Sequence, residues 1–430
     1  MMERYILPEI GDIWKEETKY QHWLDVELSA CEARTASEEL PEEILNDLYR
    51  YAKFDLERVK LLEADMHDEY KAFLKNVSES LGDDFQYMHR DITDTEVQDI
   101  CLSMQMRDST NVLLDKLSQV RAAIGDKARK YKNTLCIGRV NGVHTEPTSF
   151  GLKMAAWYAE LSRTADRLKK SRDEVSFGKV SGAVGTLGHR EPNVEQYVCM
   201  NAGLQVCPAA GAMLPRDGHA QYMTTLAILA GTLGKFAAEI RTLQSSEFLE
   251  LEEPYHTGRH IPMRIPFRKD AKFSTTILAL ARVVRTNAML SLENMCQWHD
   301  GDDSILESER LVIAESTVLS YYMLELLLEI MQGLCVREDR MLANLNKLGG
   351  MIFAEKLADV LKEKGVSKDK AEMIAKNYAE NAMQDGVDYK TAVSENIIVK
   401  DKLTAEEFET LFDYNSYIQN ADVILKRCGL

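Results

Sequence analysis

Apolar residues recur along most of this chain at the 3.6-residue spacing of an α-helix. The pattern predicts a helix from about residue 13 to residue 33 and much longer helices in the middle of the chain. These are expected at about 97–131, 148–175, 217–249, 274–297 and 303–335. A helix of roughly 30 residues is ~45 Å long at ~1.5 Å per residue, so these segments are long enough to build a large bundle.

Several of the long segments are apolar on more than one face, as the run from Tyr321 to Leu328 shows. A helix that is apolar nearly all round has to be buried, either in the bundle of its own chain or against other subunits. Because many segments share this feature, we favour the core of an oligomer. A monomeric bundle is the alternative.

Shorter helices and turns flank the long segments. Pro41, followed by two glutamates, is typical of a helix start. Nearer the C-terminus, Ser367 and Thr404 are expected to cap helices, and Thr404 with Glu407 fits a capping box. The fold is therefore expected to be all-α, with an N-terminal helical domain, a central long-helix domain and a small C-terminal helical domain at 1–110, 111–360 and 361–430.

Charge and composition narrow the class of protein. The chain carries 52 basic and 69 acidic residues, a formal net charge of −17, whereas a nucleic-acid-binding protein needs a basic face. The N-terminus has no apolar signal segment, and the most apolar stretch, Leu226 to Ile240, is interrupted by charges and too short to span a bilayer. The eight cysteines include no CxxC pair. We expect a cytoplasmic protein that binds no nucleic acid, membrane or metal.

Three polar, glycine-containing segments separate the long helices, at 138–147, 179–186 and 258–272. Structural turns explain the first two about as well as ligand contacts do. The third contains five Arg or Lys residues and one acid. Such a loop can close over an anionic ligand, and we expect it to be mobile without one. A solvated basic loop is the alternative.

Histidines are the side chains best suited to proton transfer near neutral pH. His67 precedes Asp68 directly, and His219 follows Arg216-Asp217-Gly218. Each is a candidate acid or base, although a lone histidine is more often structural.

Six dispersed segments together resemble the adenylosuccinate lyases of the fumarase/aspartase superfamily, and the resemblance runs over essentially the whole chain. They are ERYILPEI at 3–10, GVHTEPTSFGLK at 142–153, SGAVGT at 181–186, RDGHA at 216–220, LARVVR at 280–285 and WH at 298–299.

The resemblance implies a three-domain, all-α subunit whose long central helices form the core of a homotetramer with active sites shared between subunits. It also implies cleavage of a succinyl group from nitrogen by β-elimination, which releases fumarate and needs no metal or organic cofactor. In the family, a serine on a mobile loop is the base and a histidine protonates the leaving nitrogen.

This sequence departs from the family at those two groups. The second serine of the family's Ser-Ser-x-Met-Pro-x-Lys-x-Asn motif falls on Met263, which cannot accept a proton. The histidine of its Thr-His-Gly motif is Asn141, which cannot act as an acid near pH 7. Candidates for the acid and base roles are therefore His67, His144, His260 and Asp270.

Other family positions that contact the substrate are also changed. A glutamine becomes Ala212, and an arginine and a serine of the phosphate pocket become Gly301 and Leu306. The lysine of the loop motif becomes Arg268. The candidate substrate-binding residues are Arg4, Tyr5, Asp68, Thr93, Asp94, Thr95, Arg264, Arg268, Ser304 and Arg310.

Two functions from different classes follow. The first is a lyase whose site has been repurposed for a different small anionic substrate, because the scaffold motifs survive while the pocket changes. The second is a catalytically inactive paralogue that serves as a binding or scaffold protein. Genuine adenylosuccinate lyase activity is a lesser alternative, since removing one acid or base typically costs ~10²–10⁴-fold in rate.

Overall fold

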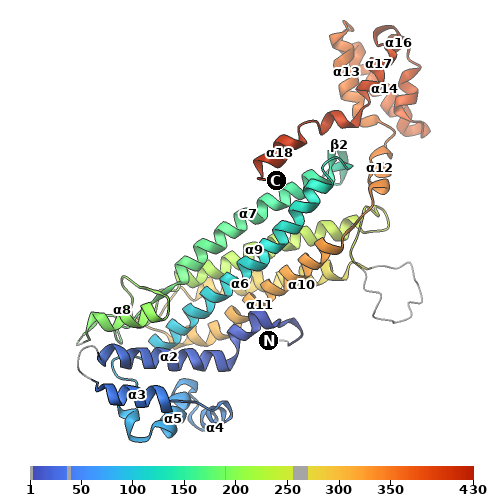
Figure 1. The fold of residues 1–430 in the computed structure, drawn as a ribbon. Coiled ribbons are helices and arrows are strands. Elements are labelled where there is room, and N and C mark those ends of the chain that lie inside the picture. Colours follow the sequence, from blue (N-terminus) through green and yellow to red (C-terminus); the bar gives the residue numbers. More distant parts are fainter. Residues whose placement is uncertain (1–2, 36–39, 189, 255–269) are drawn as a thin grey trace, which may run out of the picture. The chain divides into compact units, whose positions relative to one another are not determined.

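The computed structural model describes residues 3–35, 40–188, 190–254 and 270–430. The chain is mainly helical, which confirms the all-α class. The long helices begin and end within a few residues of the predicted bounds (Figure 1). They are α6 (Asp94–Lys130), α7 (Phe150–Val175), α9 (Asp217–Leu243), α10 (Lys272–Glu293) and α11 (Asp303–Gly333).

The chain divides into two compact units. Unit 1 comprises residues 1–119, 162–235 and 276–326, and unit 2 comprises residues 120–161, 236–275 and 327–430. Each long helix contributes residues to both units. The three domain boundaries expected from the sequence stay a prediction.

Unit 1 contains the N-terminal helices, drawn in blue in Figure 1. They are α2 (Glu16–Thr35), α3 (Glu42–Tyr51), α4 (Leu56–Met66) and α5 (Glu69–Leu81). Together with α8 (Pro192–Asn201), they enclose a core in which aromatic rings meet. The Trp23 ring lies 4.9 Å from Tyr70 and 5.5 Å from Phe73, between centroids. Such contacts add to the burial energy and hold α2 against α5.

Unit 2 includes a hairpin and a group of short C-terminal helices. The hairpin pairs β1 (Leu135–Val140) with β2 (Val143–Ser149) in antiparallel fashion. The helices are α12 (Glu338–Asn346), α13 (Ala354–Glu363), α14 (Lys368–Asp385), α15 (Tyr389–Ser394), α16 (Ile397–Lys402), α17 (Ala405–Leu411) and α18 (Ala421–Arg427). Phe353, Tyr389 and Phe412 are central to a separate apolar core among them.

The two predicted caps differ in outcome. Thr404 and Glu407 form the expected capping box at α17, with Thr404 Oγ1 accepting from Glu407 N at 3.2 Å and Glu407 Oε2 accepting from Thr404 N at 2.9 Å. Ser367 does stand at the N-cap of α14, but its side chain makes no capping hydrogen bond. The prediction that Ser367 is the N-cap of this helix is therefore confirmed, although its hydroxyl does not form the capping bond.

The remaining elements are short. They are α1 (Pro8–Gly11), β3 (Phe177–Gly178), β4 (Gln205–Val206), β5 (Leu251–Glu252), β6 (Cys335–Val336), and the 3₁₀ turns η1 (Glu3–Tyr5), η2 (Asp12–Trp14), η3 (Gly82–Tyr87), η4 (Met351–Phe353) and η5 (Tyr414–Tyr417). Strand β3 pairs with β4 in parallel, and β5 pairs with β6 antiparallel.

Two of the long helices, α9 and α11, are apolar over much of their length. By length and composition alone, α9 and α11 could each cross a membrane. In the most apolar window of each, 61% of α9 and 72% of α11 is buried inside the protein. The stretch 226–240, which the sequence marks as too short to span a bilayer, lies within α9 and is part of this buried helix. Burial of this extent is typical of the core helices of a bundle.

Candidate active site

A cavity of about 900 Å³ in unit 1 brings together most of the candidate residues of that unit. Its walls come from α4, the junction of α4 with α5, and the N-terminal turns of α6 and α11. The candidates that line it are His67, Asp68, Thr93, Asp94, Thr95 and Arg310. Residues more than 200 positions apart in the sequence thus share one hollow.

His67 and Asp68 form the junction between two helices. His67 is the C-cap of α4 in the left-handed conformation, with φ of 53°. Asp68 is the N-cap of α5, where its Oδ1 accepts a hydrogen bond from Lys71 N at 3.0 Å. The other carboxylate oxygen accepts from Lys71 Nζ at 2.7 Å. Both residues line the cavity because the chain reverses there, while the Asp68 carboxylate is engaged by Lys71.

Thr93 and Glu96 shape the start of α6. Thr93 Oγ1 accepts from Glu96 N at 3.3 Å, and Glu96 Oε2 accepts from Thr93 N at 2.9 Å, which is the reciprocal pattern of a capping box. The spacing of a threonine and a glutamate three residues later signals this motif in the sequence. Thr95 and Asp94 follow in the first turn, so the box positions them at the cavity wall.

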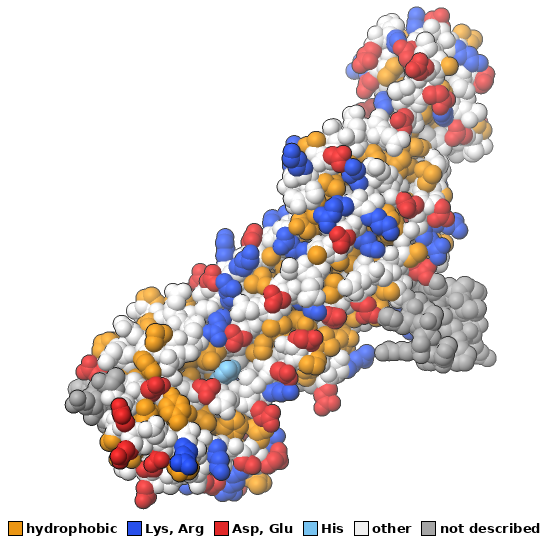
Figure 2. All heavy atoms as spheres, in the orientation of Figure 1, with side chains coloured by type: hydrophobic (Ala, Val, Ile, Leu, Met, Phe, Trp, Pro, Cys, Tyr) orange, Lys and Arg blue, Asp and Glu red, His pale blue; other side chains and the backbone are white. Residues whose placement is uncertain are grey.

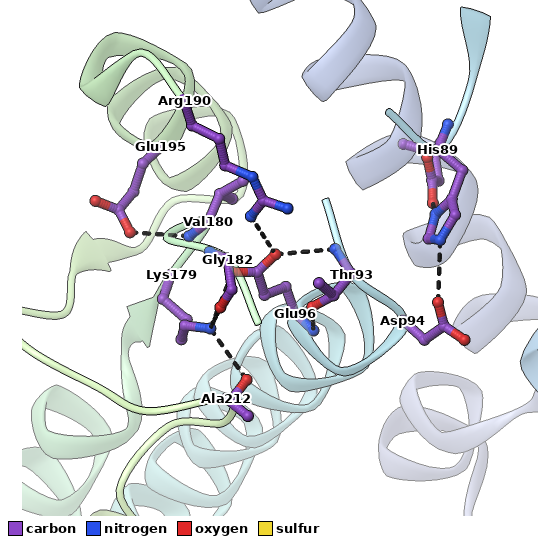
Figure 3. Close-up of polar contacts among 11 residues, drawn as sticks. His89, Thr93, Asp94, Glu96, Lys179, Val180, Gly182, Arg190, Glu195 and Ala212 are labelled. Atoms are coloured by element: carbon purple, nitrogen blue, oxygen red, sulfur yellow. Dashed lines mark hydrogen bonds and ion pairs between the residues drawn. The ribbon is translucent and has the colours of Figure 1, made fainter. Parts of the chain in front are cut away.

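The buried carboxylate of Glu96 also anchors the glycine segment at 179–186. Its Oε1 accepts from Lys179 Nζ at 2.9 Å and from Gly182 N at 2.7 Å, and its Oε2 lies 3.1 Å from Arg190 Nη1 (Figure 3). Lys179 also donates to the carbonyl of Ala212 at 3.0 Å. Burial raises the pKa of Glu96, but Lys179 and the backbone donors outweigh that effect and lower it. These contacts give the glycine segment a structural role.

His89 is a further candidate that the sequence does not reveal. Its ring lies between two carboxylates, with Nδ1 at 2.7 Å from Glu27 Oε1. Its Nε2 lies 3.0 Å from Asp94 Oδ1, the contact drawn in Figure 3. Burial alone lowers the pKa of His89, but the bonds to Asp94 and Glu27 outweigh it and raise the pKa to about 10. His89 is thus an imidazolium at neutral pH that fixes Asp94 at the cavity wall. Glu27 is 62 positions away, so no local spacing reveals the pair.

Arg310, at the α11 wall of the cavity, is engaged by carboxylates. Its Nη1 lies 3.4 Å from Glu69 Oε2 and 3.2 Å from Glu307 Oε1, and its Nη2 donates to Gln98 Oε1 at 3.1 Å. Ser304 is close in sequence but is not among the lining residues. Its hydroxyl donates to Asp302 Oδ1 at 2.6 Å.

Arg4 and Tyr5 lie in η1, and neither is among the lining residues of this cavity. The Arg4 guanidinium carbon is 5.2 Å from the centroid of the Tyr5 ring, a cation–π distance. Tyr5 in turn meets Tyr322 edge-on, with 5.2 Å between centroids. Their role as ligand contacts stays a prediction.

Asn141 and His144 belong to the hairpin of unit 2. Asn141 and Gly142 form its two-residue turn, and both have positive φ, 53° and 80°. A type I′ turn requires such values, and Asn-Gly is its most favoured sequence. Asn141 therefore has a structural explanation, and the Asn-Gly pair was the signal in the sequence for this unpredicted hairpin.

His144 is half-buried on β2, opposite Arg139. Burial lowers the pKa of His144, and the charges of Arg139 and Lys347 lower it further. Its Nδ1 is buried and has no hydrogen-bond partner among the residues that the structure describes. A neutral imidazole with an unused nitrogen is chemically able to accept a proton.

Most of the basic segment lies outside the described residues, and with it lie Met263, Arg264, Arg268 and His260. Its expected mobility and its ligand contacts stay predictions. Asp270 is described in unit 2 and is exposed, and its carbonyl accepts from Lys272 N at 2.9 Å, just before α10 begins.

Ala212 and Gly301, which the resemblance aligns with a glutamine and an arginine, lie against each other in unit 1. Ala212 N donates to the carbonyl of Asp300 at 2.8 Å. A Cβ atom added to Gly301 would lie only 2.9 Å from the Cβ of Ala212. The small side chains at both positions therefore permit a close approach of two segments.

Arg216 lies fully buried between two acids. It donates to Asp99 through Nη1 at 3.2 Å and Nη2 at 2.8 Å, and its Nε lies 3.1 Å from Glu309 Oε1. Burial raises the pKa of Glu309 to about 7, although Arg216 opposes the shift. His219, 3% exposed, has a pKa well below the ordinary value because burial and Arg216 disfavour its charge. Its environment favours a structural role.

Comparison with known proteins identifies the family. A family model described as lyase matches residues 7–259, and one described as adenylosuccinate lyase C-terminus matches residues 350–428. The adenylosuccinate lyases of Bacillus subtilis (strain 168) and Synechocystis sp. (strain PCC 6803) are each 36% identical, over 100% of this chain and of each relative. The adenylosuccinate lyase of Staphylococcus saprophyticus is 35% identical over the same share.

Solved structures show the same fold at lower identity. A fumarate lyase from Mesorhizobium sp. BNC1 superposes with a TM-score of 0.89 at 23% identity, covering 100% of this chain and 99% of that one. A 3-carboxy-cis,cis-muconate lactonizing enzyme from Pseudomonas putida gives 0.90 at 22% identity, covering 99% and 96%. Since one family model spans more than half of the chain and the relatives match it from end to end, this chain belongs to the adenylosuccinate lyase family.

Proposed function

We propose that this protein is a lyase that cleaves a carbon–nitrogen bond by β-elimination in a small substrate other than adenylosuccinate. The observation that carries the proposal is the unit 1 cavity, which retains His67, Thr93, Thr95 and Arg310 in one hollow. Family membership supports the reaction type, and the replaced acid and base at Asn141 and Met263 support a different substrate.

The chemistry requires two proton transfers. As the C–N bond breaks, the proton on the neighbouring carbon leaves to a base, a C=C bond forms, and the nitrogen receives a proton from an acid. We assign the base role to His144 of a neighbouring subunit in the proposed tetramer, because burial and nearby cations lower its pKa and its Nδ1 is unused by the described residues. We assign the acid role to His67 in the cavity. Asp270 and His260 are the alternative bases.

The proposed assembly is a homotetramer whose sites are shared between subunits, in the cytoplasm and without a metal or organic cofactor. Exposed apolar side chains on the long helices support association. Among them are Ile228 on α9 at 47%, Met289 on α10 at 60% and Leu311 on α11 at 72% exposure. Figure 2 shows apolar side chains gathered over the stretch that the long helices occupy.

The reverse reaction tests the function without knowledge of the substrate. The purified protein is incubated with fumarate and a panel of amines, and N-succinyl adducts are sought by mass spectrometry. We expect adducts with a subset of amines, and their loss in His67→Gln and His144→Gln. Absence of any adduct, together with no thermal stabilisation by fumarate or other small polycarboxylates, would overturn the proposal and favour an inactive binding protein.

The inactive paralogue is the second candidate. It is favoured by Asn141 as a turn residue and by the contact between Ala212 and Gly301, because both changes have structural explanations that need no catalysis.

The lesser alternative, genuine adenylosuccinate lyase activity, is tested by following adenylosuccinate cleavage by absorbance. We expect no cleavage by the unmodified protein. A Met263→Ser, Asn141→His double variant, which restores the family's serine and histidine, is assayed in parallel. Turnover by the unmodified protein at ordinary enzymatic rates, ~1–10³ per second, would show that the roles assigned here are wrong.

A further inference from the structure

Carboxylates outnumber cations on the walls of the unit 1 cavity. The cations are Lys60, Lys71 and Arg310. The carboxylates are Glu63, Asp68, Glu69, Asp94, Asp303 and Glu307. A site built to hold a phosphate dianion needs the opposite balance, because nearby like charges repel the ligand.

Every cation on these walls is already paired. Lys60 Nζ lies 3.2 Å from Glu16, Lys71 Nζ lies 2.7 Å from Asp68, and Arg310 lies between Glu69 and Glu307. Glu63 and Asp303, by contrast, have no ion pair within the part of the chain that the structure describes. The unbalanced charge of the cavity is therefore negative.

An adjoining hollow of about 210 Å³ provides an independent observation. It shares Glu69, Gln98, Leu306 and Arg310 with the cavity, and Glu309 lines it. Glu309 is only 2% exposed, and its Oε2 has no hydrogen-bond partner among the described residues. A buried carboxyl oxygen without a hydrogen-bond partner is costly, and a donor from a ligand would satisfy it.

The positions that the resemblance assigns to a phosphate also lack free positive charge. Leu306, in place of a hydroxyl, lines both hollows. Gly301 stands in place of a guanidinium and supplies no cation, and an added Cβ atom there would lie only 2.9 Å from Ala212 Cβ. Of the three positions Gly301, Leu306 and Arg310, only Arg310 carries a cation, and it is paired with two carboxylates.

We propose that this cavity binds a positively charged amine or guanidinium group of the substrate, at the place where the resemblance to adenylosuccinate lyases implies a phosphate. This inference rests on the proposed function, since it takes the cavity to be part of the substrate site. The substrate is then an N-succinyl compound, anionic at its carboxylates, whose nitrogen-bearing half carries a cation instead of a phosphate ester.

The test uses the full-length protein and four probes: putrescine, agmatine, AMP and inorganic phosphate. Binding is measured by calorimetry, and fumarate adducts of each amine are measured by mass spectrometry. The cavity variant is Glu63→Gln with Asp303→Asn. The matched control is Asp166→Asn with Glu191→Gln, which removes the same charge from two exposed positions of the same unit.

We expect putrescine or agmatine to bind and AMP and phosphate not to bind. The cavity variant should weaken amine binding about tenfold, which corresponds to ~1.4 kcal/mol. The control should change it less than about twofold, because unspecific attraction to an acidic chain falls equally in both variants. Equal losses in the two variants, or tighter binding of AMP than of either amine, would overturn the inference.

The search for fumarate adducts distinguishes a failure of this inference from a failure of the proposed function. Adducts with neutral amines alone would uphold the lyase and overturn the cationic site. Amine binding that depends on Glu63 and Asp303, without adducts or stabilisation by fumarate, would uphold the cationic site and overturn the lyase.

Discussion

His67 occupies a backbone conformation that glycine adopts more easily than any other residue. Its φ of 53° places it in the left-handed region, where a side chain crowds the backbone. Most helices with this ending have glycine at such a position. A histidine kept there despite the strain is what a functional side chain at a helix junction would require.

The first prediction follows from that strain. His67→Gly should leave the free energy of unfolding within ~1 kcal/mol of the original value, because relief of strain offsets the greater entropy of the unfolded chain. It should abolish formation of fumarate adducts. His67→Gln is the matched control, since it keeps the strain and removes the acid. Adduct formation by either variant at the original rate would exclude His67 as the acid.

The second prediction concerns His89. Its pKa of about 10 in the folded protein exceeds the ordinary value of 6.5, so its ion pairs with Glu27 and Asp94 stabilise the fold fully below about pH 6.5. That contribution is lost as the pH rises from 6.5 through 10. The protein should therefore be more stable than His89→Gln at pH 6, and the difference should shrink by pH 10.

Urea unfolding of both proteins at pH 6, 8 and 10 measures this difference. The comparison cancels the titration of lysines and tyrosines elsewhere, apart from Tyr70, whose hydroxyl donates to Glu27 Oε1 at 2.5 Å. A difference that stays constant or grows with pH would contradict the raised pKa.

For individual residues, the sequence predicted which side chains line the cavity better than it predicted their partners. It singled out His67, Asp68 and Thr93 to Thr95, which the structure places in one cavity. It did not reveal His89, because the partner carboxylate of Glu27 comes from another helix. It also did not reveal that Arg310 pairs with Glu69, since the two residues lie far apart in the sequence.

Among elements, the long helices were predictable because apolar residues repeat at a helical period over several turns. The hairpin at 135–149 was not predicted, since its strands are short and only the Asn-Gly pair marks the turn. The segments at 207–213 and 299–302 have no periodic pattern. That they meet depends on the small side chains of Ala212 and Gly301, which the resemblance to the family singled out separately.

The third prediction tests that meeting of segments. Gly301→Ala should destabilise the protein by about 1–3 kcal/mol, because the new Cβ would lie 2.9 Å from Ala212 Cβ. Ala212→Gly on its own should have a smaller effect. In the double variant the clash is absent, so the two changes should be non-additive by ~0.5–3 kcal/mol in unfolding experiments. Additive losses would show that the segments do not touch through these atoms.

At the scale of the whole molecule, the apolar character of the long helices matters most. Within one chain, 61% of the most apolar 18-residue segment of α9 is buried, and 72% of that of α11. The side chains of Ile228, Met289 and Leu311 nevertheless remain exposed. Scattered exposed apolar residues are ordinary, but several on neighbouring long helices are typical of an interface between subunits. The sequence indicated that apolar side chains would remain exposed on one chain, because its long helices are apolar on more than one face.

The last prediction is that the protein forms a tetramer through these helices. Light scattering at micromolar concentration should give a mass four times that of the chain. Met289→Lys with Leu311→Lys should dissociate it, because burying each apolar side chain contributes ~1.5–3 kcal/mol and a buried unpaired lysine reverses that gain. Ile397→Lys with Met383→Lys is the control, since these side chains are 83% and 74% exposed on α16 and α14. The control should remain a tetramer. A stable monomer before any substitution would mean that the exposed apolar side chains are not an interface, and the proposal of shared active sites would fall with it.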